Sequence, residues 1–143
     1  MKADALIIGG GLMGSSTALH LARRGVRSLV LEKDSPGRHA SGVNAGGLRR
    51  LNRHPAEIPL SVAAAEVWTN IEALVDSDCD AQFSAQVRVA ENEAEMARLA
   101  ERAEMVRDLG YHHEELIGRA ELYRLVPALA RHCQGALVCR GDG

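Results

Sequence analysis

The chain has 143 residues, 46% of them hydrophobic and 25% charged, which fits one globular domain. A net charge of −2 gives no basic surface for nucleic acid, and no apolar run approaches the roughly 18 residues that a membrane-spanning helix needs. The three cysteines form no C-x-x-C pair, the histidines lack metal-ligand spacing, and the first residues are unlike a signal peptide. We therefore expect a cytoplasmic protein without a metal site.

The first 32 residues predict a strand, a helix and a second strand. Residues 5–8 are a short apolar run, typical of a buried parallel strand. Residues 13–24 have helical character, and Gly25 follows as a natural stop. Residues 28–31 predict a second buried strand. This order is that of a βαβ unit, and it makes the fold class α/β.

The rest of the chain alternates loops with helices and strands. Residues 33–50 are rich in Gly, Ser, Asn and Pro and predict a loop. Pro59 lies near the first turn of an expected helix, whose apolar residues recur at helical spacing as far as Val75. Further on we expect strands at residues 83–90 and 135–139 and helices at residues 93–109 and 120–125.

A glycine-rich turn, Gly9-x-Gly11-x-x-Gly14, joins the first strand to the first helix. In such a turn Gly9 permits the tight bend, Gly11 lets a pyrophosphate approach the backbone, and Gly14 lets helix and strand pack closely. The amino terminus of the helix offers free N–H groups to the phosphates. Glu32 ends the second strand, where its carboxylate can accept hydrogen bonds from ribose hydroxyls and would repel a 2′-phosphate. The pattern predicts a site for NAD or FAD rather than NADP.

A second glycine-rich stretch at residues 37–49 separates these two cofactors. An NAD domain has no evident need for it, whereas a small-residue loop can run along the longer FAD molecule and reach a flavin edge with its backbone. The stretch favours FAD. An NAD-dependent dehydrogenase domain and a non-catalytic nucleotide-binding module remain as alternatives.

Four segments resemble the D-amino-acid-oxidase-like superfamily of FAD enzymes, which includes glycine oxidase and sarcosine oxidase. They are Gly9-x-Gly11-x-x-Gly14-x-x-x-Ala18, Glu32-Lys33, Ser41-Gly42-Val43-Asn44-Ala45-Gly46-Gly47-Leu48 and the tail from Gly135 to Gly143. The resemblance covers nearly the whole chain. It implies a Rossmann-like FAD-binding βαβ unit with additional helices and strands, incomplete relative to the family.

The resemblance also implies roles for particular residues. Glu32, with Lys33, would bind the adenosine ribose, and the Ser41 hydroxyl would help the first loop to hold the pyrophosphate. The cofactor-binding candidates are Gly9, Gly11, Leu12, Met13, Gly14, Glu32, Lys33, Ser41, Asn44, Ala45, Gly46, Gly47 and Leu48. Family members oxidise the C–N bond of an amine or amino acid, passing a hydride to flavin N5 and releasing an imine that hydrolyses. Some relatives tether the flavin through a histidine at the position of Asn44, so we expect non-covalent FAD here.

Family members run to well over twice this length. We therefore expect residues 1–143 to be the amino-terminal part of an FAD-binding domain. Residues 1–50 would hold the βαβ unit and the second glycine-rich loop, and residues 51–143 the helices and the first strands of a substrate domain. No catalytic residue can be assigned. We expect this chain alone to be inactive, and to need the remainder of the enzyme or a further protein chain as a partner.

Overall fold

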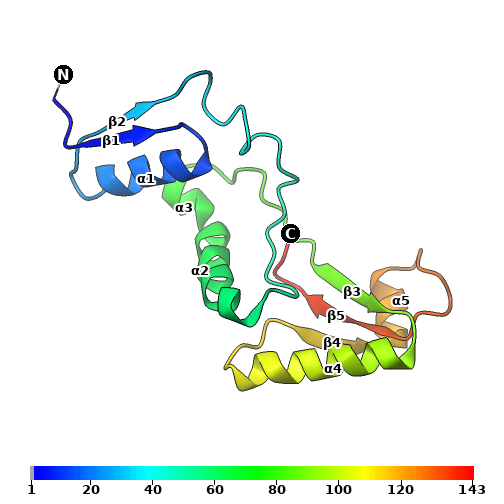
Figure 1. Cartoon of the computed structure of the whole chain (residues 1–143). Helices are drawn as coiled ribbons and strands as arrows, with labels where there is room; N and C mark the ends of the chain where they lie inside the picture. Colours follow the sequence, from blue (N-terminus) through cyan, green and yellow to red (C-terminus); the bar gives the residue numbers. More distant parts are fainter. Residues whose placement is uncertain (1) are drawn as a thin grey trace. The chain divides into compact units, whose positions relative to one another are not determined.

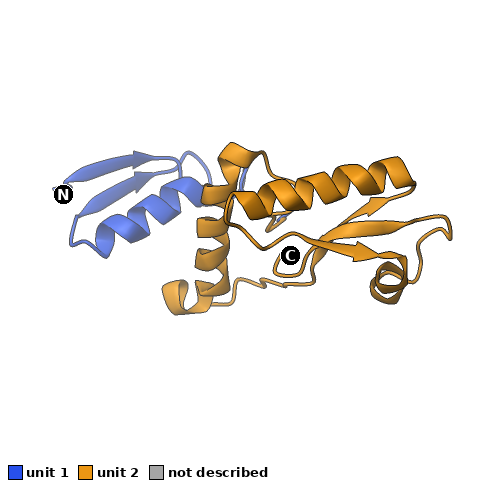
Figure 2. Cartoon of the chain, turned by 90° about the horizontal axis from the view of Figure 1, so that it is seen from below, with its two compact units in different colours: residues 1–46 blue, residues 47–143 orange. Residues whose placement is uncertain are grey.

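The structure is a computed structural model that describes residues 2–143 (Figure 1). It consists of two compact units, Met1–Gly46 and Gly47–Gly143, which Figure 2 colours separately. The division falls inside the second glycine-rich stretch. No helix among residues 2–143 combines the length and the apolar character needed to cross a membrane.

The first unit is the predicted βαβ motif. Strand β1 (Ala5–Ile8) pairs in parallel with β2 (Ser28–Leu31), and helix α1 (Leu12–Ala22) connects them. The register places Ile7 beside Val30. A Cβ atom added at Gly14 of α1 would lie 3.3 Å from Cγ2 of Ile7, so the helix packs closely on this face of the sheet.

The other face of this two-stranded sheet is open, and here the expectation of two fully buried strands is wrong. Four apolar side chains are exposed on it, with Ile8 the most exposed at 87%; they are Leu6, Ile8, Leu29 and Leu31. Side chains alternate between the faces of a sheet, and among residues 2–46 only α1 supplies a cover.

The second unit is built on an antiparallel sheet. Strand β5 (Gly135–Cys139) lies between β3 (Gln86–Ala90) and β4 (Glu115–Gly118). Every residue of β5 is buried, because both of its edges are paired and both of its faces are covered. The strand β4 was not predicted.

Two hydrophobic clusters cover the two faces of β5. Leu137 and Cys139 pack with Leu99 and Ala103 of helix α4 (Glu93–Asp108). Ala136 and Val138 on the opposite face belong to a second cluster, together with Leu122 of helix α5 (Arg119–Leu125). The apolar stripe expected for residues 93–109 is thus confirmed at Leu99, Ala103 and Val106.

The expected helix from Pro59 to Val75 is two helices in the structure. A 3-10 turn (Pro55–Glu57) leads into α2 (Ile58–Thr69), and α3 (Ile71–Val75) follows after a break at Asn70, whose φ of −111° and ψ of 23° are not helical. The expected strand at residues 83–90 is also shorter. It begins at Gln86 because Ala85 has a φ of 69°, which lies outside the β region.

Candidate functional site

The glycine-rich turn leads from β1 into α1 as its pattern predicts. Gly9 has a φ of 100°, a region that favours glycine, and its N–H donates to the carbonyl oxygen of Leu31 at 2.8 Å. A Cβ atom at Gly14 would overlap the carbonyl oxygen of Gly9. Both glycines are therefore required by the backbone itself, and the turn brings the amino terminus of α1 directly after the first strand.

The first turn of α1 has N–H groups without partners inside the helix. The N–H of Leu12 donates to Oγ of Ser41 at 2.9 Å. Among residues 2–143, the N–H groups of Gly11 and Met13 have no protein acceptor. The turn thus presents two free donors and the positive end of an 11-residue helix, which is the chemistry that a phosphate group needs.

Glu32 stands directly after β2, beside the glycine-rich turn. Its Oε2 accepts a hydrogen bond from the N–H of Gly10 at 2.6 Å, and its Oε1 accepts one from the N–H of Asp34 at 3.1 Å. These bonds, that from Gly10 first, lower the pKa of Glu32. The carboxylate is ionised and fixed, and each oxygen keeps a second acceptor direction for a hydroxyl group.

The second glycine-rich loop is tied to the first within the same unit. The N–H of Gly37 donates to the carbonyl oxygen of Gly10 at 3.0 Å, and Ser41 accepts from Leu12. Asn44 orders the end of this loop, since its Nδ2 donates to the carbonyl oxygen of Ser41 at 2.7 Å and its Oδ1 accepts from the N–H of Gly46 at 2.6 Å. The structure therefore brings Gly9 to Gly14, Glu32 and Ser41 together. The Lys33 side chain is exposed beside them.

Gly47 and Leu48, the last two candidates, belong to the second unit. Leu48 exchanges two backbone hydrogen bonds with Gly143, at 2.8 and 2.9 Å. The N–H groups of Arg50 and Leu51 both donate to Oδ2 of Asp142, at 2.9 and 2.8 Å. The segment that follows the second glycine-rich loop is thus anchored to the last residues of the chain.

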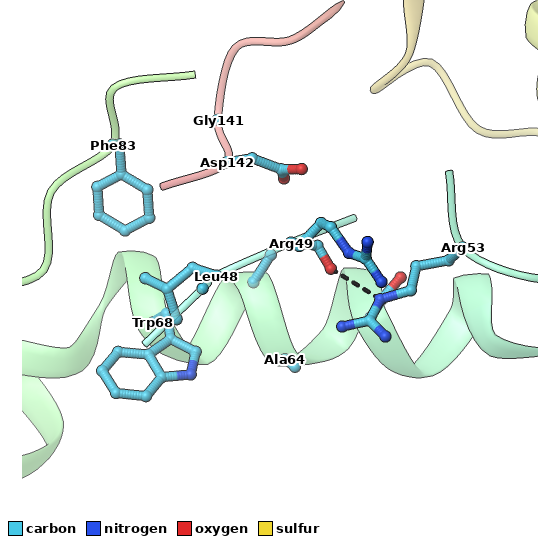
Figure 3. A pocket seen from close by; sticks show the side chains of 11 residues that line it. Leu48, Arg49, Arg53, Ala64, Trp68, Phe83, Gly141 and Asp142 are labelled. Carbon is cyan, nitrogen blue, oxygen red and sulfur yellow. Dashed lines mark hydrogen bonds between the residues drawn. The ribbon is translucent and has the colours of Figure 1, made fainter. Parts of the chain in front are cut away.

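A cavity of about 130 Å³ lies between this segment and helix α2 (Figure 3). Leu48, Trp68 and Phe83 form its apolar end, and the side chains of Arg49 and Arg53 lie at its other end. Nε of Arg53 donates to the carbonyl oxygen of Arg49 at 3.1 Å. A cavity with one apolar and one cationic end has the character to hold an anionic group beside an apolar one.

Sequence reasoning missed Asp142, Arg49 and Arg53 as site residues. The run of arginines directly after the second glycine-rich loop was the available signal for the two cations. Asp142 had no comparable signal, because its partners lie more than 90 residues earlier in the chain. No group of three or more potential metal ligands occurs among the residues that the structure describes.

Comparison with known proteins assigns this arrangement to a family. The family model of the FAD dependent oxidoreductases named DAO matches residues 4–143. The chain belongs to this family. The match does not favour the two alternatives, a dehydrogenase domain for NAD and a non-catalytic module.

Relatives of known type match the chain over different lengths. One of the opine oxidase polypeptides of Rhizobium meliloti is 31% identical over 152 aligned residues, covering 99% of this chain. Monomeric sarcosine oxidase of Streptomyces avermitilis is 40% identical over 73 residues, or 48% of the chain. Among solved structures, glycine oxidase from Bacillus cereus superposes with a TM-score of 0.82 at 27% identity, over 99% of this chain and 39% of that one.

The chain spans 41% of the length of the opine oxidase polypeptide and 19% of that of the sarcosine oxidase. The α/β fold with a parallel strand pair matches the FAD-binding, Rossmann-like fold of the glycine oxidase neighbour. The family and the fold class expected from the sequence are therefore confirmed.

Proposed function

We propose that the whole protein binds FAD through its two glycine-rich loops. Gly9, Gly11, Leu12, Met13 and Gly14 would surround the pyrophosphate. Glu32, with Lys33 nearby, would hold the adenosine ribose. The loop residues Ser41, Asn44, Ala45, Gly46, Gly47 and Leu48 would continue along the cofactor to the flavin ring. Residues 1–143 would thus form the amino-terminal part of the FAD-binding domain and lead into a substrate domain.

The geometry of Glu32 carries this proposal. A carboxylate at the end of β2, fixed by the N–H of Gly10 and by that of Asp34, stands where ribose hydroxyls need an acceptor. The N–H groups of Gly11 and Met13, which are free of protein acceptors among residues 2–143, support the same placement, because a pyrophosphate needs donors on the next turn. The Leu12 N–H is already bonded to Ser41, so the loop would bind phosphate mainly through the neighbouring N–H groups.

We propose further that the FAD is held without a covalent bond. An amide is no nucleophile toward the 8α carbon of the flavin. Both polar ends of the Asn44 side chain are moreover bonded to the loop backbone, at 2.7 and 2.6 Å. His39, the nearest histidine in the loop, lies 3.4 Å from the carboxylate of Asp34 and is exposed, which favours an ionic or solvent contact.

The reaction that we propose is oxidation of the C–N bond of an amine or amino acid. The substrate loses a hydride from the carbon next to nitrogen and a proton from the nitrogen, and water then splits the resulting imine into a carbonyl compound and an amine. When bound, the flavin supplies the two-electron acceptor at N5. The residues of this chain would bind and orient the cofactor. The small-molecule substrates named for relatives, such as sarcosine, glycine and opines, define the class to test.

Anaerobic mixing of the whole FAD-containing protein with glycine, sarcosine, D-amino acids and opines tests this reaction. Loss of the visible flavin absorbance with one of these compounds, together with one equivalent of carbonyl product, is the expected result. A flavin that dithionite bleaches but that none of these compounds reduces would contradict it. Hydrogen peroxide formed on admitting air would distinguish an oxidase from a dehydrogenase.

The 143-residue chain alone should not turn over any of these substrates, and we propose that the remainder of the enzyme or a further protein chain completes the site. Its open sheet face, with Ile8 and Leu6 exposed, should also make the isolated chain prone to associate. The free thiols of Cys79, Cys133 and Cys139 fit the cytoplasmic location that we propose.

A further inference from the structure

Asp142 is a carboxylate buried in the second unit, with 1% of its surface exposed. Four donors converge on it. Oδ2 accepts from the N–H groups of Arg50 and Leu51, at 2.9 and 2.8 Å, and Oδ1 accepts from Nε of Arg50 at 3.1 Å and from Sγ of Cys139 at 3.0 Å. A buried charge costs free energy unless it is paired and hydrogen-bonded, and here both oxygens are fully engaged.

The backbone around Asp142 makes a second set of bonds to the same stretch of chain. Gly143 and Leu48 exchange two backbone hydrogen bonds. The carbonyl oxygen of Asp142 accepts from the N–H of Ala85 at 2.9 Å, next to the start of β3. The turn after β5 is thereby fixed to the sheet, and residues 48–51 are fixed to the turn through the N–H groups of Leu48, Arg50 and Leu51.

We propose that Asp142 is a positioning residue for the flavin-side end of the second glycine-rich loop. Its carboxylate would hold Arg50 and Leu51 against the rigid turn after β5, so that Gly47 and Leu48 keep one backbone position beside the flavin. This inference rests on the proposed function, which puts those two residues next to the ring. A binding site works only when a second layer of contacts holds its residues to within a fraction of an ångström.

A carboxylate is the group that this position requires. All four neighbours are donors, and an ionised carboxylate is a side chain with acceptors only. An asparagine of the same shape would turn its NH₂ group toward at least one N–H or guanidinium donor. One bond would then be replaced by a repulsive contact, and residues 50 and 51 would move away from the turn.

Glu114 provides the matched control. It is also buried, with 4% of its surface exposed, and it also pairs with an arginine, since Nε and Nη2 of Arg102 donate to it at 2.9 Å each. Its backbone partner is the N–H of Asn52 at 2.7 Å. Glu114 therefore stabilises the unit to a similar degree while making no hydrogen bond to residues 47–51.

The test compares Asp142→Asn with Glu114→Gln in the whole FAD-containing protein. Both variants should unfold at a lower temperature than the wild type. Only Asp142→Asn should change the visible circular dichroism of the bound flavin, and it should raise the dissociation constant for FAD by roughly tenfold, as expected for the loss of one well-placed hydrogen bond. An unchanged flavin spectrum and FAD affinity in Asp142→Asn would overturn the inference. An equal change in Glu114→Gln would overturn it as well.

If Asp142→Asn yields no folded protein, Arg50→Met decides the question. That variant removes the guanidinium partner of Asp142 and leaves both backbone N–H bonds in place. It should produce a smaller change in the flavin dichroism, and a wild-type spectrum would overturn the inference. A wild-type protein without bound FAD would overturn the proposed function and this inference together, whereas an FAD-bound wild type with unaffected variants would overturn the inference alone.

Discussion

Ser41 Oγ accepts a hydrogen bond from the backbone N–H of Leu12 at 2.9 Å, across 29 residues of sequence. A serine from the second glycine-rich loop thus caps the helix that the first loop begins, a task that Gly11 at the N-cap position cannot perform with its own side chain. The two loops form one structural element. The position of the second loop is therefore set by the helix to which the first loop leads.

We predict that Ser41→Ala lowers the free energy of unfolding by about 1 kcal/mol, the usual cost of losing a helix cap. The same substitution should weaken FAD binding, because the second loop loses its bond to α1. Denaturant unfolding of the whole protein measures the first effect and fluorescence titration with FAD the second. Ser16→Ala, at an exposed position in the middle of α1, is the control and should change neither. Equal behaviour of the two variants would rule out the capping role of Ser41.

Replacing Glu32 by alanine should raise the dissociation constant for FAD by roughly ten- to a hundredfold, because the ribose hydroxyls lose a charged acceptor. Asp34→Ala is the matched control, since that carboxylate lies two residues on and pairs with Arg38 and His39 at the surface. Titration of the apoprotein with FAD gives both constants. If the affinity of Glu32→Ala equals that of Asp34→Ala and the wild type, Glu32 does not bind the ribose.

The strand–helix–strand core was accessible from the sequence because its signals are local. The glycine spacing and the two apolar runs place β1 and β2 at the residues where the structure has them, and α1 within two residues at each end. The strand β4 was missed because it has only four residues and gains its stability from pairing with β5, about 20 residues further on.

The contacts that order the candidate site were beyond the sequence for the same reason. Residue types and spacing identified Glu32 and Ser41, but nothing in the pattern indicates that Ser41 bonds to Leu12 or that Glu32 bonds to Gly10. The clearest case is the pairing of Asp142 with Arg50, 92 residues apart, which depends on the antiparallel sheet between them. Tertiary contacts of this kind follow from packing, which local periodicity does not encode.

The flavin should leave the polypeptide completely when the protein is denatured. After precipitation of the whole protein with acid, all of the yellow colour is expected in the supernatant, because Asn44 offers no nucleophile and is bonded to the loop. Mass spectrometry of the pellet should give the mass of the unmodified polypeptide. A polypeptide heavier by one FAD would show that the interpretation of Asn44 and His39 is wrong.

Asp142 should make the protein sensitive to acid. Burial raises the pKa of this carboxyl group, but the hydrogen bonds from Cys139, Leu51 and Arg50 outweigh it, so the pKa lies below the ordinary value of 3.8. The stabilisation is therefore complete above about pH 4, and it is lost as the pH falls through the lowered pKa of the folded state. Asp142→Asn should show a smaller loss of unfolding free energy between about pH 5 and pH 3 than the wild type.

Cys139→Ser is the control for this pH dependence, because a hydroxyl group can still donate to Asp142. Burial, followed by the bond to Asp142, raises the pKa of the Cys139 thiol to about 12, so this donor keeps its proton throughout the acid range. Denaturation curves at a series of pH values measure all three proteins. Parallel pH profiles for Asp142→Asn and the wild type would show that the carboxylate is not ionised in the folded state.

The absorbance spectrum of the whole protein, followed by identification of the released cofactor, tests the central claim most directly. The two glycine-rich loops, Glu32 and the membership of the FAD dependent oxidoreductase family predict an oxidised flavin spectrum and the release of FAD in a 1:1 ratio to the polypeptide. Release of FMN or NAD would contradict this account, as would a colourless protein that does not bind added FAD.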